Sequence, residues 1–160
     1  MIFREHMPPF KDRVDAARQL VEKLRPYAGK GTVVFALPRG GVVLGVEVAK
    51  ALKLPLDLVI ARKIGARENE EFAIACVAED GDTVMTEEAR REDRAWFEGA
   101  KKKEMAEAER RREAYLGNRK RPDVEGKTAL VVDDGIATGL TMRCVLKEIA
   151  HRKPAKVVVA

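Results

Sequence analysis

Apolar residues follow two different periods along this chain, and the two kinds of segment alternate. Short, nearly continuous apolar runs are typical of strands buried on both faces of a parallel sheet; they span residues 32–37, 56–61, 128–133 and 156–160. Other segments repeat their apolar residues three and four apart, which predicts helices; they span residues 14–24, 42–52 and 140–151. The alternation predicts an α/β fold with a mainly parallel, twisted sheet flanked by helices.

The middle of the chain departs from this pattern. Residues 64–71 are polar and predict a loop, while the runs 72–78 and 83–85 flank an Asp-Gly pair and predict an antiparallel hairpin. Residues 86–121 predict a long charged helical insert, because acidic and basic residues recur there four apart. Gly99 is the candidate position for a break in this helix.

Length and composition indicate one domain with an aliphatic core. The chain has 160 residues, of which 46% are apolar and only 5% aromatic, so Val, Leu, Ile and Ala must fill the core. We expect residues 1–160 to form a single domain. The last run, 156–160, stops without a polar end, and we therefore expect the natural protein to continue beyond it.

Charge and cysteine usage exclude several classes of protein. Charged residues make up 36% of the chain and the formal net charge is +5, but the interleaved acids of residues 86–121 argue against a nucleic-acid-binding arm. Cys76 and Cys144 lie in apolar runs and are expected to be buried thiols, while His6 and His151 are too far apart in sequence to indicate a zinc site. No apolar stretch is long enough to span a membrane. We expect a cytoplasmic protein.

The candidate chemistry is concentrated where the run 128–133 ends. Two adjacent acids, Asp133 and Asp134, are followed by a short loop with a glycine and two threonines, and then by a helix pattern. Ligands of open α/β sheets bind at the carboxyl ends of strands. Carboxylates can accept hydrogen bonds from hydroxyls, and loop amides at a helix N-terminus can bind a phosphate. The segment therefore predicts a site for a sugar phosphate.

The stretch 129–141 resembles the phosphoribosyl-pyrophosphate loop of type I phosphoribosyltransferases, with four apolar residues, two acids, small residues and a final Gly-x-Thr. Gly135 departs slightly from that pattern, because an aliphatic residue is commoner there. Residues 38–41 look like the family's pyrophosphate loop, and Arg62-Lys63 look like its basic pair. The polar segment 65–71 would then be the family's mobile catalytic loop. The resemblance implies that ribose 5-phosphate passes from phosphoribosyl pyrophosphate to a nitrogen acceptor, usually a nucleobase, and that pyrophosphate is released.

The resemblance also implies a role for each matching residue. The 5-phosphate and ribose would be bound by Asp133, Asp134, Gly135, Ile136, Ala137, Thr138, Gly139, Leu140 and Thr141. The pyrophosphate would be bound by Arg39, Gly40, Gly41, Arg62 and Lys63. The candidate catalytic residues are Asp133, Asp134 and Arg67. Mg²⁺ would be carried by the substrate near the two acids, without a direct protein ligand. We further expect a homodimer.

Two other functions stay open at this point. A regulator that senses phosphoribosyl pyrophosphate or a nucleotide could keep the same loop without turnover, and could bind nucleic acid. A relative with a vestigial site is the third possibility, against which the intact Asp133, Asp134, Thr138 and Thr141 argue. The poor match of Arg67 to the family's catalytic loop keeps the regulator in consideration.

Overall fold

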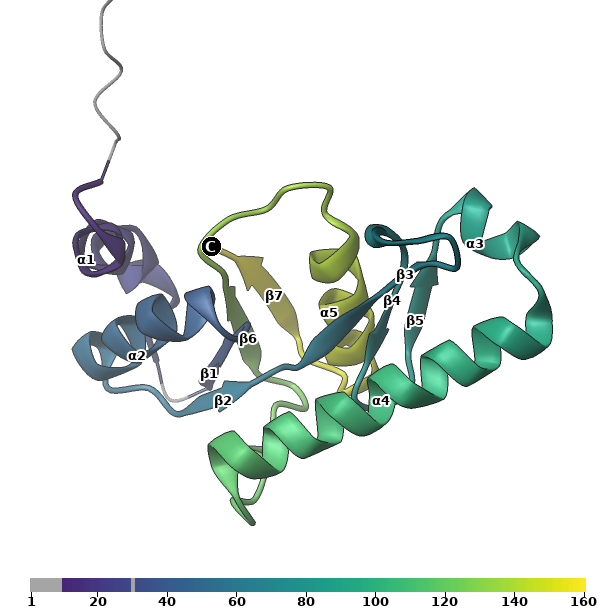
Figure 1. Ribbon diagram of the computed structural model, residues 1–160. Helices are drawn as coiled ribbons and strands as arrows, with labels where there is room; N and C mark the ends of the chain where they lie inside the picture. Colours follow the sequence, from purple (N-terminus) through teal and green to yellow (C-terminus); the bar gives the residue numbers. More distant parts are fainter. Residues whose placement is uncertain (1–9, 30) are drawn as a thin grey trace, which may run out of the picture.

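The computed structural model describes residues 10–29 and 31–160. Four parallel strands form the central sheet in the order β2-β1-β6-β7 (Figure 1). Their bounds are Leu56–Leu58 (β2), Thr32–Ala36 (β1), Thr128–Val132 (β6) and Lys156–Val159 (β7). The α/β fold with a mainly parallel sheet is therefore confirmed. Residues 1–9 and 30, among them His6, lie outside the described part of the chain.

Helices cover both faces of this sheet, because side chains alternate along its strands. Val34 and Leu130 point to one face, against α1 (Arg13–Leu24) and α2 (Gly40–Leu52). Val33 and Phe35 point to the other face, against α5 (Leu140–His151). Helix α1 begins after Asp12, whose carboxylate accepts a hydrogen bond from the Asp15 amide at 2.8 Å. The short 3-10 turn η1 (Arg25–Tyr27) follows the helix.

A second, antiparallel sheet has the order β3-β4-β5. Its strands are Ala61–Ala66 (β3), Asn69–Ala78 (β4) and Thr83–Met85 (β5). The predicted β4–β5 hairpin is confirmed, with Val77 opposite Thr83. The predicted loop at 64–71 is wrong, because most of it belongs to strands β3 and β4, which are joined by a two-residue turn. The error has a physical cause: this hairpin end is exposed, so backbone pairing holds it together and its polar side chains carry no strand signal.

The charged insert consists of two helices, α3 (Glu87–Arg91) and α4 (Arg94–Leu116). The break expected near Gly99 lies instead between Arg91 and Arg94, where the Asp93 carboxylate caps α4 by accepting a hydrogen bond from the Trp96 amide at 2.8 Å. One end of α4 packs on the antiparallel sheet and the other packs beside β1 and β2.

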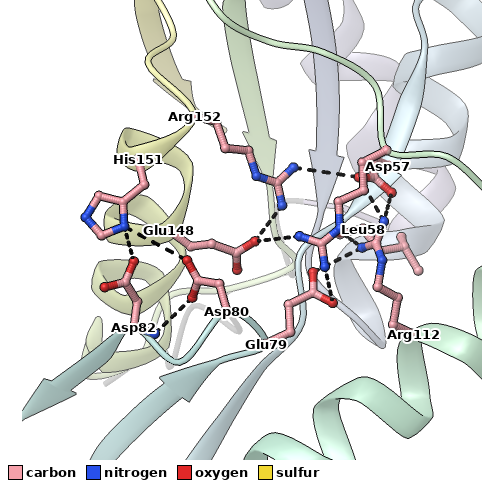
Figure 2. A network of polar contacts seen from close by, with 10 residues as sticks. Asp57, Leu58, Glu79, Asp80, Asp82, Arg112, Glu148, His151 and Arg152 are labelled. Carbon is pink, nitrogen blue, oxygen red and sulfur yellow. Dashed lines mark hydrogen bonds and ion pairs between the residues drawn. The ribbon is translucent and has the colours of Figure 1, made fainter.

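Buried ion pairs fix α4 beneath both sheets. The Arg112 guanidinium lies between the carboxylates of Asp57 and Glu79, at 3.0 and 3.1 Å (Figure 2). The Arg152 guanidinium, at the end of α5, lies between Asp57 and Glu148, at 3.8 and 2.5 Å. This network connects the insert to β2, β4 and α5, so the position of α4 is set by tertiary contacts.

The expectations about the two cysteines and about membrane-spanning segments can be compared with the structure directly. Cys76 and Cys144 are buried free thiols, and the Cys144 thiol donates to the Cys76 carbonyl at 3.2 Å, as expected for small core residues. Among residues 10–29 and 31–160, no helix combines the length and the apolar composition that crossing a bilayer requires.

Candidate active site

The loop after β6 encloses a small hollow. Residues 135–139 connect the strand to α5, and Gly139 precedes the helix with a left-handed φ of 75°. The hollow has a volume of about 180 Å³ and is lined by this loop, by Asp133 and by Pro38 and Lys63 from other segments. A helix N-terminus opening into a hollow of this size suits a single phosphate group.

Asp133 lies at the rim of that hollow, directly after β6. Its Oδ1 accepts a hydrogen bond from the Asp134 amide at 2.9 Å. Partial burial raises the pKa of the Asp133 carboxyl above its usual value, the Asp134 amide lowers it, and the negative charge of Asp134 adds to the rise. One oxygen of the carboxylate is therefore oriented by its own turn.

Asp134 is held by a residue that the sequence did not single out. Arg13, in the first turn of α1, donates from Nε and Nη2 to Asp134 Oδ2 at 2.9 and 2.6 Å. The two residues are 121 positions apart in sequence, and no local motif marks Arg13. Because only one carboxylate oxygen is engaged, the other remains available as an acceptor.

The turn between β1 and α2 lies against both acids. A side-chain Cβ at Gly40 would come within 1.8 Å of Asp134 Oδ2, and one at Gly41 within 2.8 Å of the Val132 carbonyl oxygen. The peptide bond between Pro38 and Arg39 is cis, and Arg39 is exposed. Only glycines allow the backbone of this turn to approach the two carboxylates so closely.

The predicted basic pair does not end a parallel strand. Strand β2 stops at Leu58, so Arg62 and Lys63 lie within β3 of the antiparallel sheet. Lys63 lines the hollow under the loop of residues 135–139, whereas Arg62 Nε pairs with Glu104 Oε2 of α4 at 2.8 Å. Arg67 lies in the β3–β4 turn, outside that hollow. The structure thus brings Lys63 to the loop, whereas Arg62, its neighbour in β3, and Arg67, in the hairpin turn, do not line that hollow.

Two groups of carboxylates could contact a cation. Asp133 and Asp134, beside the loop of residues 135–139, offer the oxygen ligands that Mg²⁺ prefers. Asp80, Asp82 and His151 form a second group whose ligand atoms lie within 4.8 Å of one another. That group lies at the C-terminal end of α5, roughly 16 Å along the helix from the loop, and Lys147 Nζ is already 3.3 Å from Asp82. The first group fits a metal carried by a phosphorylated substrate.

Comparison with known proteins agrees with this geometry. The family model described as "Phosphoribosyl transferase domain" matches residues 5–160. A protein of Mycobacterium tuberculosis (strain H37Rv), whose name gives phosphoribosyl transferase as a provisional assignment, is 40% identical over 157 residues. The match covers 96% of this chain and 35% of that protein, so the chain spans about a third of the length of this curated relative.

Solved structures show the same fold. The crystal structure of the protein TT1426 from Thermus thermophilus is 38% identical, with a TM-score of 0.75 over 94% of this chain and 73% of that chain. The purine phosphoribosyltransferase from Pyrococcus horikoshii is 21% identical, with a TM-score of 0.55 over 92% of this chain and 70% of that chain. The latter likeness concerns the fold alone. From the family match and the identity to its relatives, we conclude that the chain belongs to the phosphoribosyl transferase domain family.

Proposed function

We propose that this protein transfers ribose 5-phosphate from phosphoribosyl pyrophosphate to a nitrogen acceptor of the nucleobase class and releases pyrophosphate. The observation that carries the proposal is a convergence at one edge of the parallel sheet. Asp133 and Asp134, the loop that opens into α5, and the Gly40–Gly41 turn meet there. Family membership supports the class of reaction.

In this proposal the loop of residues 135–141, which we call the phosphate loop, binds the 5-phosphate. Main-chain amides of residues 135–141 and the hydroxyls of Thr138 and Thr141 are donors at the N-terminus of α5, where the helix dipole favours negative charge. The hollow there, about 180 Å³, fits a compact anion better than an extended ligand. The loop therefore fixes one end of the substrate.

Asp133 and Asp134 then orient the ribose. Their carboxylates accept hydrogen bonds from the 2- and 3-hydroxyls, which places the reacting carbon over two negative charges. Positive charge develops on the sugar ring as pyrophosphate departs. Fixed carboxylates stabilise this charge most in the transition state. Arg13 supports the site by fixing the orientation of Asp134.

The turn after β1 and the cations of β3 serve the leaving pyrophosphate. The backbone at Gly40 and Gly41 can approach the ligand closely, and the charges of Arg39 and Lys63 neutralise part of the developing negative charge. Arg62, in β3, and Arg67, in the β3–β4 turn, would contact the same group from the side of the hairpin. Bound Mg²⁺ would neutralise further negative charge on the pyrophosphate. The homodimer and the cytoplasmic location stay predictions.

Calorimetry with phosphoribosyl pyrophosphate and Mg²⁺ tests the proposal. We expect binding by the wild type and its loss in the double variant Asp133→Asn/Asp134→Asn. Asp123→Asn is the matched control, because Asp123 is an exposed acid outside the hollow. A panel of nucleobases, assayed for pyrophosphate release, separates an enzyme from a sensor. No binding by the wild type refutes the proposal, and binding without release by any base supports the sensor instead.

A further inference from the structure

A second, larger hollow adjoins the phosphate loop. It has a volume of about 880 Å³, within the range typical of ligand pockets, and lies between the β3–β4 hairpin and helix α4. Pro38, Lys63 and Thr141 line both this hollow and the smaller one under the loop. A ligand whose phosphate is bound by the loop can therefore extend past Lys63 towards the insert.

Cations from three separate elements face the larger hollow. Lys63 comes from β3, Arg67 from the hairpin turn and Lys103 from α4. Within the described ranges, the structure pairs none of the three with a carboxylate. By contrast, Arg62 on the same wall is paired with Glu104 at 2.8 Å. An anion entering the hollow would thus meet three unneutralised positive charges, which outweigh the two glutamates, Glu70 and Glu71, at its hairpin side.

The face of α4 that lines the hollow is kept open by small residues. Ala95, Gly99 and Ala100 lie on the same face as Lys103, at helical spacing. A Cβ added at Gly99 would meet no atom within 4 Å. The Arg62–Glu104 pair joins α4 to β3 beside this face, and apolar packing of α4 on the antiparallel sheet also holds the two walls of the hollow in place.

From these contacts we propose that the insert is a substrate-binding element, in which Lys103 binds the pyrophosphate group of phosphoribosyl pyrophosphate. The inference rests on the proposed function and adds to it a residue from α4. The small hollow accommodates the 5-phosphate, the larger one accommodates the leaving group, and Lys63 lies where they join.

Calorimetric titration with two separate probes tests this assignment, namely inorganic pyrophosphate with Mg²⁺ and ribose 5-phosphate. The Lys103→Ala variant loses one charge-assisted contact at an exposed site, and we expect it to bind pyrophosphate about 5- to 20-fold more weakly than the wild type. The affinity for ribose 5-phosphate should stay within about twofold. Lys102→Ala is the matched control, because Lys102 is the neighbouring exposed lysine and does not line the hollow. Lys103→Arg should retain most of the affinity.

Gly99→Leu gives an independent check, because it fills the hollow without removing a charge. Leucine favours a helix more than glycine does, so thermal unfolding should occur at the same or a higher temperature while pyrophosphate binding weakens. Equal pyrophosphate affinities for Lys103→Ala and Lys102→Ala, or unchanged binding by Gly99→Leu, would overturn the inference. If the wild type binds neither phosphoribosyl pyrophosphate nor ribose 5-phosphate, it is the proposed function that fails.

Discussion

Replacing Arg112 by methionine tests whether buried ion pairs hold the insert in place. The side chain of Arg112 is 12% exposed, and those of its partners Asp57 and Glu79 are 3% and 2% exposed. Arg112 also donates to the Leu58 carbonyl at 3.0 Å (Figure 2). Methionine keeps most of the apolar packing of the side chain but leaves two buried carboxylates without their shared cation.

The expected loss of stability follows from these contacts. Removing one partner of a buried ion pair costs about 3–5 kcal/mol. The lower end applies here, because Glu79 keeps a contact with Arg121 at 3.1 Å and Asp57 keeps one with Arg152 at 3.8 Å. For a domain of this size, about 3 kcal/mol corresponds to a decrease in Tm of roughly 6–12 °C.

Urea and thermal unfolding, followed by circular dichroism, measure the effect. Arg110→Met is the matched control, because Arg110 lies on the same helix and pairs with Glu107 at the surface, at 2.7 Å. Such exposed pairs contribute little to the stability of the fold. Equal losses of stability in the two variants would refute the reasoning, since they would show that the buried pairs of Arg112 with Asp57 and Glu79 stabilise the fold no more than an exposed pair does.

Three further predictions concern the site and its pH dependence. Gly40→Ala should weaken binding of phosphoribosyl pyrophosphate by about tenfold or more, as expected for a lost hydrogen bond to a charged group, because the methyl group would displace the Asp134 carboxylate. The control is Gly29→Ala, whose Cβ would meet no atom within 4 Å, and equal affinities in calorimetry would exclude a role for Asp134. Burial raises the pKa of Glu148 to about 7 from an ordinary value of 4.5, so between these values the folded protein binds a proton that the unfolded chain has released. The free energy of unfolding should therefore fall as pH rises through this window. In urea titrations at several pH values, Glu148→Gln should make the free energy of unfolding depend less on pH. The same pH dependence in the variant and the wild type would contradict the prediction. Because the pKa of Asp133 is raised, affinity for phosphoribosyl pyrophosphate should begin to fall on acidification at a higher pH than for an ordinary aspartate. Calorimetry across the acidic range measures this dependence, and a fall that begins only where an ordinary aspartate is protonated would contradict the prediction.

Local sequence was sufficient for the elements whose signal lies in adjacent residues. The run 128–132 is a buried strand because side chains on both of its faces are apolar, and Asp133 follows at its carboxyl end. The helix from Leu140 begins where apolar spacing changes to three and four. Asp12 caps α1 by accepting a hydrogen bond from the amide of Asp15, three residues along the chain. In these cases the physical cause, burial or capping, acts within a few residues.

The sequence failed where the cause lies between distant segments. Residues 64–71 look like a loop because their strands are held by backbone pairing at an exposed hairpin. Arg62, expected at a strand end, pairs with Glu104 because α4 crosses β3. The role of the insert could not be read from its alternating charges, since such charges are typical of any solvated helix.

The sequence by itself determined the α/β architecture and the loop with two acids at the end of β6, because hydrophobic periodicity and a short motif are local properties of the chain. Only the tertiary structure decided which residues surround that loop. Arg13 reaches Asp134 across 121 positions, Gly40 lies against the same carboxylate, and the pair between Arg62 and Glu104 joins α4 to the hairpin. These contacts depend on how separate elements pack, and side-chain packing between elements leaves no period in the sequence.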